Sequence, residues 1–310
     1  MLAGGRGRAI RVGPEGFAAR RRAILATMDD SVLRLHGPAR PTVPLVLDSP
    51  HSGRTMPADF GAACSQAALR EFEDCFVDDL FGAATARGAS LLAALFPRTY
   101  LDANRGADDI DPALLSEPWP EPLAPGAKTA VGKGLIWRTL TGDEPIYDRA
   151  LSVAEVQERI ERCHRPYHRA LQGLLDAAHG RFGQVLHLNC HSMGPTSSVS
   201  IEGVDGQPRA DFVLGDRDGS SCDPALTEFV RAHLAALGYE VRVNDPFKGV
   251  ELVRAYSNPG AGRHSLQIEV NKRLYMDSQR IEPHQGFATV RAQLGTLVDA
   301  LLARFAPAHG

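Results

Sequence analysis

Apolar runs of two different kinds alternate along the chain. Short, strand-like runs occur at 44–48, 185–189, 212–214, 240–243 and 265–270. Longer stretches in which apolar residues recur every three or four positions predict helices at 65–87, 153–179, 224–237 and 282–305. Strands that alternate with helices are typical of a central, largely parallel or mixed sheet with helices on both faces. The pattern therefore predicts a three-layer α/β/α fold.

Two of the strand-like runs end in a His-Ser pair with a glycine close behind. The first leads to His51 and Ser52, and the second leads to His191 and Ser192. In open α/β sheets, ligands bind outside the carboxyl ends of strands. Two imidazoles delivered there from distant parts of a chain are a common way to assemble a catalytic metal site. A metal-dependent enzyme is therefore the leading hypothesis.

The composition argues against several classes of partner. The chain has 310 residues and a formal net charge of -3, whereas nucleic-acid-binding domains are usually clearly basic. No apolar run approaches the roughly 18 residues that a membrane span needs. The five cysteines lack C-x-x-C spacing, which argues against a disulfide framework and predicts a reducing, cytoplasmic location. We expect a small-molecule substrate, no nucleic-acid or membrane partner, and a monomer or small homo-oligomer.

The first 40 residues differ in character from the rest. Residues 1–40 are rich in arginine, glycine and proline and contain no apolar signal-peptide core. We expect a disordered arm or a start codon assigned too early, since Met28 opens a more usual beginning; a transit peptide is the least favoured alternative. Residues 41–310 are expected to form a single catalytic domain. Within it, the Pro- and Gly-rich stretch 117–134 predicts a long surface loop.

Two carboxylates in the predicted helix 65–87 are candidate metal ligands. Asp74 and Asp78 are four positions apart, so on a helix they share a face that is separate from the apolar stripe. On spacing alone, a solvated acidic face is the simpler interpretation. The alternative is that one of these carboxylates turns inward and binds a metal.

A glutamate lies in the middle of the last strand-like run. Alternation along the strand places Gln267, Glu269 and Asn271 on one face and apolar residues on the other. A glutamate on an inner strand is costly unless it has a partner or a function. On an edge strand it would be an ordinary solvated residue. The polar character of the whole face favours the wall of a site.

Arg105 follows another apolar stretch, directly after Asn104. Its guanidinium either pairs with a surface carboxylate or presents a charged fork to a substrate carboxylate or an oxyanion. A serine nucleophile receives less support, because Ser52 and Ser192 lack the G-x-S-x-G pattern.

His164 and His168 have the i, i+4 spacing of a helical zinc pair. However, no glutamate follows His164, and Pro166 distorts the intervening turn. We therefore expect this pair to have a packing role.

Six ordered blocks resemble the N-formylglutamate amidohydrolase family. They are LDSPHSG (47–53), FVD (76–78), DANR (102–105), NCHSM (189–193), LGDRDG (214–219) and QIEVNKRLYM (267–276). The resemblance extends from about residue 44 to residue 305. That family is distantly similar to zinc carboxypeptidases and implies a phosphorylase/hydrolase-like fold.

By position, the resemblance implies that His51 and His191 bind Zn²⁺ or another divalent metal. It further implies that Glu269 is the general base and that a cation such as Arg105 stabilises the oxyanion. The reaction implied is hydrolysis of N-formylglutamate, or of a close N-acyl amino acid, to an acid and an amino acid.

The carboxylate ligand departs from the carboxypeptidase pattern. Those enzymes carry a glutamate three residues after the first histidine, where this chain has Arg54. Asp78 or Asp74 must serve in its place. Asp78 ranks first, because it falls in the Val-Asp block that the resemblance covers.

A dicarboxylate substrate needs further positive or amide groups. The candidates are Asn104, Arg138, Arg254 and Arg263, although each arginine by itself is equally typical of a surface ion pair. Two alternatives stay open: a zinc amidase or carboxypeptidase acting on a small peptide or cell-wall fragment, and a non-catalytic binding protein with the same fold.

Overall fold

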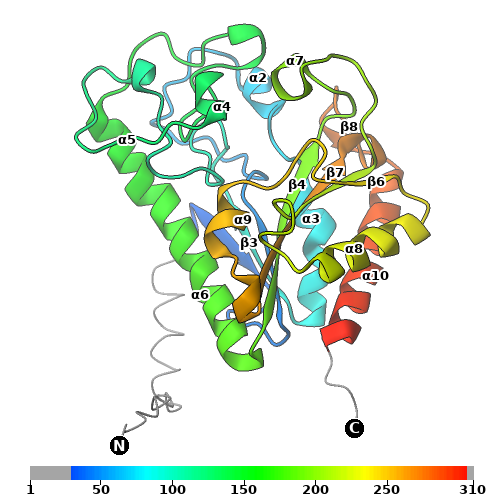
Figure 1. The fold of residues 1–310 in the computed structure, drawn as a ribbon. Helices are drawn as coiled ribbons and strands as arrows, with labels where there is room; N and C mark the ends of the chain where they lie inside the picture. Colours follow the sequence, from blue (N-terminus) through cyan, green and yellow to red (C-terminus); the bar gives the residue numbers. More distant parts are fainter. Residues whose placement is uncertain (1–28, 306–310) are drawn as a thin grey trace, which may run out of the picture.

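A seven-stranded mixed sheet runs through the centre of the molecule (Figure 1). The structure is a computed structural model that describes residues 29–305. The strand order is β1-β3-β2-β4-β7-β5-β6. The strands β2, β3, β4 and β7 are parallel to one another, while β1 and the β5–β6 pair run antiparallel to their neighbours. The strand bounds are β1 (Leu33–His36), β2 (Leu45–Ser49), β3 (Ser90–Ala94), β4 (Val185–Met193), β5 (Phe212–Gly215), β6 (Val241–Val243) and β7 (Arg263–Asn271).

Helices cover both faces of the sheet, which confirms the three-layer prediction (Figure 1). One face carries α5 and α6, joined by a π-helical turn at Ile160–His164, together with α9. The other face carries α3, α8 and α10. The helix bounds are α2 (Gln66–Arg70), α3 (Val77–Phe81), α4 (Ala127–Ala130), α5 (Val153–Arg159), α6 (Arg165–Phe182), α7 (Val199–Glu202), α8 (Pro224–Ala236), α9 (Glu251–Tyr256) and α10 (Gly286–Phe305). A small ribbon, β8 (Met276–Asp277) and β9 (Glu282–Pro283), precedes α10.

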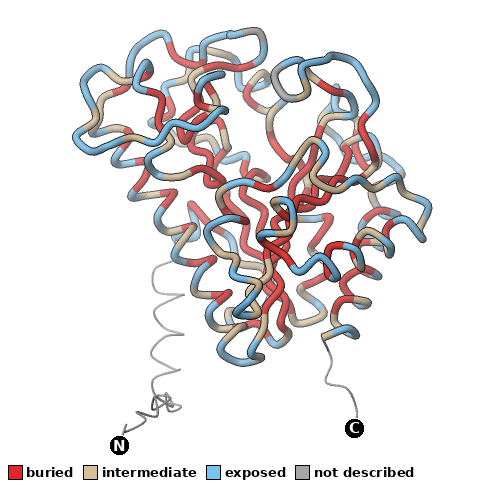
Figure 2. Tube along the Cα trace, viewed as in Figure 1, coloured by how far each residue is buried: buried red, intermediate tan, exposed pale blue. Residues whose placement is uncertain are grey.

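The two faces of the central strands differ in polarity. Leu188 and Ile268 point into the apolar core beneath α3 and α10. Because side chains alternate along a strand, Asn189, His191 and Glu269 face the α6 and α9 side. Figure 2 shows that the central strands are mostly buried, and only the first two residues of β7 are partly exposed. The sheet therefore combines an apolar face that stabilises the fold with a polar face that is enclosed by protein.

Two predicted boundaries are wrong for identifiable reasons. The helix expected at 65–87 is divided into α2, α3 and a 3-10 segment at Gly82–Arg87, because Phe76 adopts a left-handed conformation with φ 64° directly before α3. Part of the segment expected at 1–40 to be a disordered arm is ordered instead, because Leu33–His36 forms β1 and pairs with β3. Residues 1–28 lie outside the described residues.

Other expectations agree with the structure. The stretch 117–134 is irregular except for the single turn of α4, as expected of a surface loop. Within residues 29–305, no helix combines the length and apolar character that crossing a bilayer requires.

Gly53 tests how closely the loop after β2 packs. A Cβ atom there would lie 2.2 Å from the carbonyl oxygen of Phe96 and 2.5 Å from the carbonyl carbon of Leu95. We expect Gly53→Ala to lower the free energy of unfolding by about 1–3 kcal/mol, the usual cost of overpacking. The control Gly180→Ala, on α6 with no neighbour within 4 Å, should raise it by roughly 0.5–1 kcal/mol. Urea unfolding measures both, and an unchanged Gly53→Ala variant would contradict this packing.

Candidate metal centre

Three buried side chains converge at the carboxyl ends of the central strands. His51 lies just after β2, His191 lies near the end of β4, and Asp74 lies in the turn before α3. One ligand atom from each lies within 4.8 Å of the other two. All three side chains are at most 4% exposed. The structure thus brings together the two histidines that the strand ends singled out.

The outer nitrogen of His51 is held by a carboxylate. His51 Nε2 lies 2.6 Å from Asp102 Oδ1. Burial raises the pKa of Asp102, but the charges of His51, Arg105 and Arg98 lower it well below its usual value. An ionised carboxylate only accepts hydrogen bonds, so His51 Nε2 is the donor in this contact. The other ring nitrogen, Nδ1, has no hydrogen-bond partner and is the atom that can bind a metal.

The outer nitrogen of His191 is held by an amide oxygen. His191 Nε2 lies 2.8 Å from Asn189 Oδ1. The Asn189 amide is oriented by Asp48, whose Oδ1 accepts from Asn189 Nδ2 at 2.8 Å. Asn104 Nδ2 also lies 3.2 Å from His191 Nε2, and as a donor it would favour the opposite tautomer. With its proton on Nε2, His191 donates to Asn189 and leaves the Nδ1 lone pair free for a metal. With its proton on Nδ1, it instead donates to Asp74 Oδ2 at 3.0 Å and accepts from Asn104, which Leu252 orients. Metal binding through Nδ1 requires the first tautomer.

Three potential ligand atoms face one small volume. Asp74 Oδ2 lies 3.3 Å from His51 Nδ1 and 3.0 Å from His191 Nδ1, and the second distance is that of a hydrogen bond. Burial lowers the pKa of His191, which keeps that imidazole neutral. Burial raises the pKa of Asp74, but its contacts with the two histidines and the charge of Arg98 outweigh burial and keep it ionised. Two neutral imidazoles and one carboxylate are a donor set that suits Zn²⁺ or a similar divalent ion.

Asp74, and not Asp78, lies with the two histidines, so we take Asp74 as the candidate carboxylate ligand. Asp74 is anchored because its amide donates to the carbonyl of His51 at 2.9 Å, and Asp74 Oδ1 accepts from Ser192 at 3.1 Å. Asp78 comes after the left-handed turn, in the first turn of α3, and is not a member of the cluster. Burial and neighbouring Asp79 raise the pKa of Asp78.

Glu269 lies in register with His191 on the adjacent strand. Its strand, β7, is internal, so the alternative of a solvated edge residue is excluded. Gln267 Nε2 donates to Glu269 Oε1 at 2.9 Å. Burial and the Asp74 carboxylate raise the pKa of Glu269 well above its ordinary value. A buried carboxyl group with a raised pKa beside a possible metal cluster is a candidate for proton transfer.

A cation that the sequence analysis missed lies closer to the cluster than Arg105. Arg98 Nη1 is 3.9 Å from Asp74 Oδ1, and Arg98 Nη2 donates to Asp102 at 3.1 Å. Its Nε is buried without a partner. Arg105 instead donates to the carbonyl of Asn104 at 2.9 Å and to the carbonyl of Lys133 at 3.2 Å, so it holds its own loop. Arg98 lies in no recognisable motif, so only its position reveals it.

The other expected substrate-binding residues are engaged with the protein. Asn104 Oδ1 accepts from the amide of Leu252 at 2.9 Å, which ties α9 to the centre. Three arginines pair with carboxylates at 2.7 to 2.8 Å, namely Arg138 with Asp111, Arg254 with Glu251 and Arg263 with Asp176. Arg263 also begins β7, six residues before Glu269, and therefore lies about 20 Å away at the far end of the strand. This distance excludes Arg263 from the site.

The helical histidine pair positions the loop that follows β3. His164 Nε2 lies 2.9 Å from the carbonyl of Arg105, and His168 Nε2 lies 2.9 Å from the carbonyl of Ala103. The two rings stack with centroids 4.0 Å apart. Burial and the neighbouring His164 lower the pKa of His168 to about 3, so both rings act as neutral donors. This agrees with a structural role instead of metal binding.

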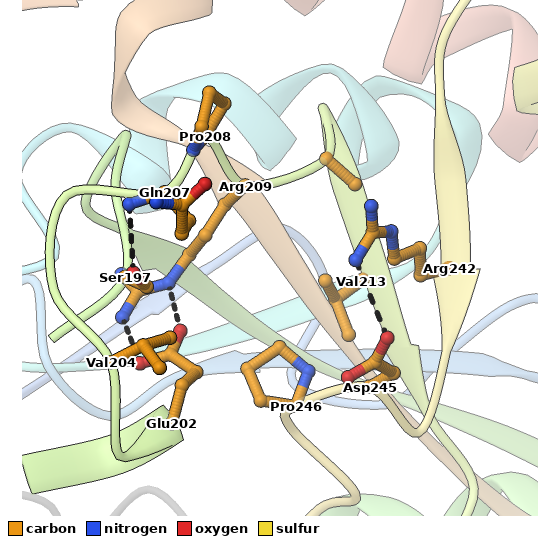
Figure 3. Close-up of a pocket in the computed structure, with 11 residues that line it drawn as sticks. Ser197, Glu202, Val204, Gln207, Pro208, Arg209, Val213, Arg242, Asp245 and Pro246 are labelled. Carbon is orange, nitrogen blue, oxygen red and sulfur yellow. Dashed lines mark hydrogen bonds and ion pairs between the residues drawn. The ribbon is translucent and has the colours of Figure 1, made fainter. Parts of the chain in front are cut away.

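A cavity of about 220 Å³ beside β5 and β6 offers no free charge (Figure 3). Arg209 pairs with Glu202 through two hydrogen bonds of 2.5 and 3.0 Å. Arg242 pairs with Asp245 at 3.4 Å. Because its cations are neutralised, we assign no ligand to this cavity.

Fold and site together define an α/β protein with a buried His-Asp-His cluster suited to a divalent metal. A model of the N-formylglutamate amidohydrolase family matches residues 43–276, most of the chain. The chain belongs to the N-formylglutamate amidohydrolase family, as the sequence blocks indicated.

Individual relatives agree with this assignment. N-formylglutamate deformylase of Pseudomonas putida is 32% identical over 252 residues, covering 80% of this chain and 86% of the relative. The enzyme of the same description from Pseudomonas aeruginosa is 32% identical over 270 residues, covering 85% of this chain and 94% of the relative. The crystal structure of N-formylglutamate amidohydrolase from Ralstonia eutropha JMP134 has a TM-score of 0.84 and 48% identity, covering 89% of this chain and 98% of that one.

The tautomer of His191 can be tested directly. In Asn189→Leu, His191 Nε2 loses its acceptor and keeps only the donor Asn104, so the proton should move to Nδ1. Nitrogen NMR of the metal-free, histidine-labelled protein reports this tautomer. We also expect the affinity for Zn²⁺ to fall by on the order of 10- to 100-fold in a chelator competition.

Asp48→Asn is the control for this experiment. Its side-chain oxygen still accepts from Asn189, so His191 should keep the proton on Nε2. An Nε2 proton that persists in Asn189→Leu would show that Asn189 does not determine the tautomer.

Proposed function

We propose that the protein is a zinc-dependent amidohydrolase that converts N-formylglutamate and water to formate and glutamate. The observation that carries the proposal is the convergence of one ligand atom each from His51, Asp74 and His191 within 4.8 Å, with Glu269 in register with His191 on the next strand. The names of the relatives support the choice of substrate. A cytoplasmic location is part of the proposal, supported by five cysteines that are all free.

Each member of the cluster has a defined role. His51, Asp74 and His191 would hold the metal, and Asp102 and Asn189 keep the two imidazoles in the tautomer that presents Nδ1. When bound, zinc supplies Lewis acidity, which polarises a carbonyl and lowers the pKa of a water molecule.

The proton transfers fall to Glu269. Its carboxylate accepts a proton from the attacking water and returns a proton to the departing amine as the C–N bond breaks. Gln267 holds the carboxylate through Oε1, which orients the other oxygen for this exchange. Arg98, beside Asp74 and Asp102, supplies positive charge for the oxyanion that develops on the formyl oxygen. We assign this role to Arg98 in place of Arg105, whose donors are occupied by the chain.

Asp74→Asn and Asp78→Asn form a matched pair of variants that tests which aspartate binds the metal. We expect Asp74→Asn to lose stoichiometric zinc and nearly all hydrolytic activity, because one charged ligand is removed. Asp78→Asn, four residues further along, should bind zinc as the wild type does. Metal content after dialysis and the rate of formate release measure the two effects. Retention of zinc by Asp74→Asn together with its loss from Asp78→Asn would reverse the assignment.

A substrate panel tests the reaction itself. The zinc-loaded protein should release formate from N-formylglutamate faster than it hydrolyses N-acetylglutamate or short peptides. Glu269→Gln serves as the blank, and its kcat should fall by at least about 100-fold, as expected when a general base is removed. Preferred cleavage of peptides would instead identify an amidase or carboxypeptidase. Metal binding without turnover of any compound would identify a binding protein.

A further inference from the structure

Lys133 holds an ammonium group in a fixed position beside the candidate metal centre. Its Nζ lies 5.2 Å from the ring centroid of Phe72 and 5.3 Å from that of Trp137. The two rings pack edge to face, with centroids 5.3 Å apart. Trp137 Nε1 donates to Asp102 at 3.3 Å, and Phe72 is two residues before Asp74. Both rings are thus attached to the segments that build the centre, so the ammonium is positioned relative to it.

This ammonium forms no ion pair in the described part of the chain. No carboxylate of residues 29–305 lies within ion-pair distance of Lys133 Nζ, and the ammonium donates no hydrogen bond to these residues, although the charge of Asp143 acts on it from further away. An aromatic face attracts the charge but does not replace acceptors for three N–H donors. Arg138 and Arg254 differ, since each is paired with a carboxylate. Lys133 therefore keeps its hydrogen-bonding capacity for a ligand.

Other cations surround Lys133. The guanidinium carbon of Arg98 lies 5.0 Å from the same Trp137 ring. Arg105 donates to the backbone carbonyl of Lys133 at 3.2 Å. Burial and the charge of Arg98 lower the pKa of Lys133, and burial and three neighbouring cations lower that of Lys128. Positive charges that repel one another in a half-buried region are costly until an anion joins them.

We propose that Lys133 binds the side-chain carboxylate of the substrate and thereby selects acyl amino acids with an acidic side chain. This inference rests on the proposed hydrolytic function. Arg98 contacts Asp74 and Asp102 directly, whereas Lys133 reaches Asp102 only through Trp137. Lys133 is the cation more remote from the reacting amide, and this is where the far end of a glutamate side chain would lie.

The test compares two substrates of the same shape, one charged and one neutral. N-formylglutamine replaces the side-chain carboxylate of N-formylglutamate with an amide. In Lys133→Met, we expect KM for N-formylglutamate to rise by on the order of 10- to 100-fold, the size of one charge-assisted hydrogen bond, with little change in kcat. The kinetics with N-formylglutamine should stay close to those of the wild type. Lys133→Arg keeps the charge and should retain most of the preference for glutamate.

Two results would overturn the assignment: an equal loss for both substrates in Lys133→Met, or no loss for either. Calorimetric binding of glutarate and its monoamide, which contain no formyl amide, separates this inference from the proposed function. Wild-type protein should prefer glutarate, and Lys133→Met should not. If glutarate is preferred but N-formylglutamate is not hydrolysed, the proposed reaction fails while the carboxylate subsite stands. If wild-type protein shows no preference for glutarate, the subsite fails whatever the reaction is.

Discussion

The candidate centre depends on three ligand atoms that converge in the protein interior. Asp74 Oδ2 lies 3.3 Å from His51 Nδ1 and 3.0 Å from His191 Nδ1, and a metal needs a lone pair from each of these atoms. Asp102 and Asn189 place acceptors beside the opposite ring nitrogens and so favour the tautomers that present Nδ1 to the metal. Those acceptors need hydrogen-bond partners of their own, so the positions of residues further from the centre are constrained as well.

The central strands satisfy this constraint through their register. Asp48, Asn189 and Gln267 lie side by side on β2, β4 and β7, and His191 lies beside Glu269 in the next row. Asp48 is fully buried, yet it accepts from Tyr167 on α6 at 2.6 Å as well as from Asn189. A carboxylate with so many donors is far less costly to bury than an isolated one. Hydrogen bonds on the polar face therefore run from Tyr167 through Asp48 and Asn189 to His191, a member of the candidate metal cluster.

The cations near the centre differ in how their donors are paired. The arginines that the sequence suggested for substrate binding, Arg138, Arg254 and Arg263, are each matched to a carboxylate of the protein. Arg98 pairs with Asp74 and Asp102 but keeps its buried Nε without a partner, and the Lys133 ammonium forms no ion pair within the described residues. The donors that the protein leaves without partners are the basis for the ligand contacts proposed above, and both side chains lie against Trp137.

Local pattern was sufficient to predict the layered fold, the convergence of His51 and His191, and the inward-facing Glu269. Alternation along a strand and the position of strand ends are properties of neighbouring residues, so the sequence carries them directly. The choice of Asp74 over Asp78 was decided by tertiary structure. It depends on a left-handed turn at Phe76 and on a hydrogen bond to the distant carbonyl of His51. Local patterns do not identify Arg98 and Lys133 either. The roles proposed for them depend on which partners the fold places beside each side chain.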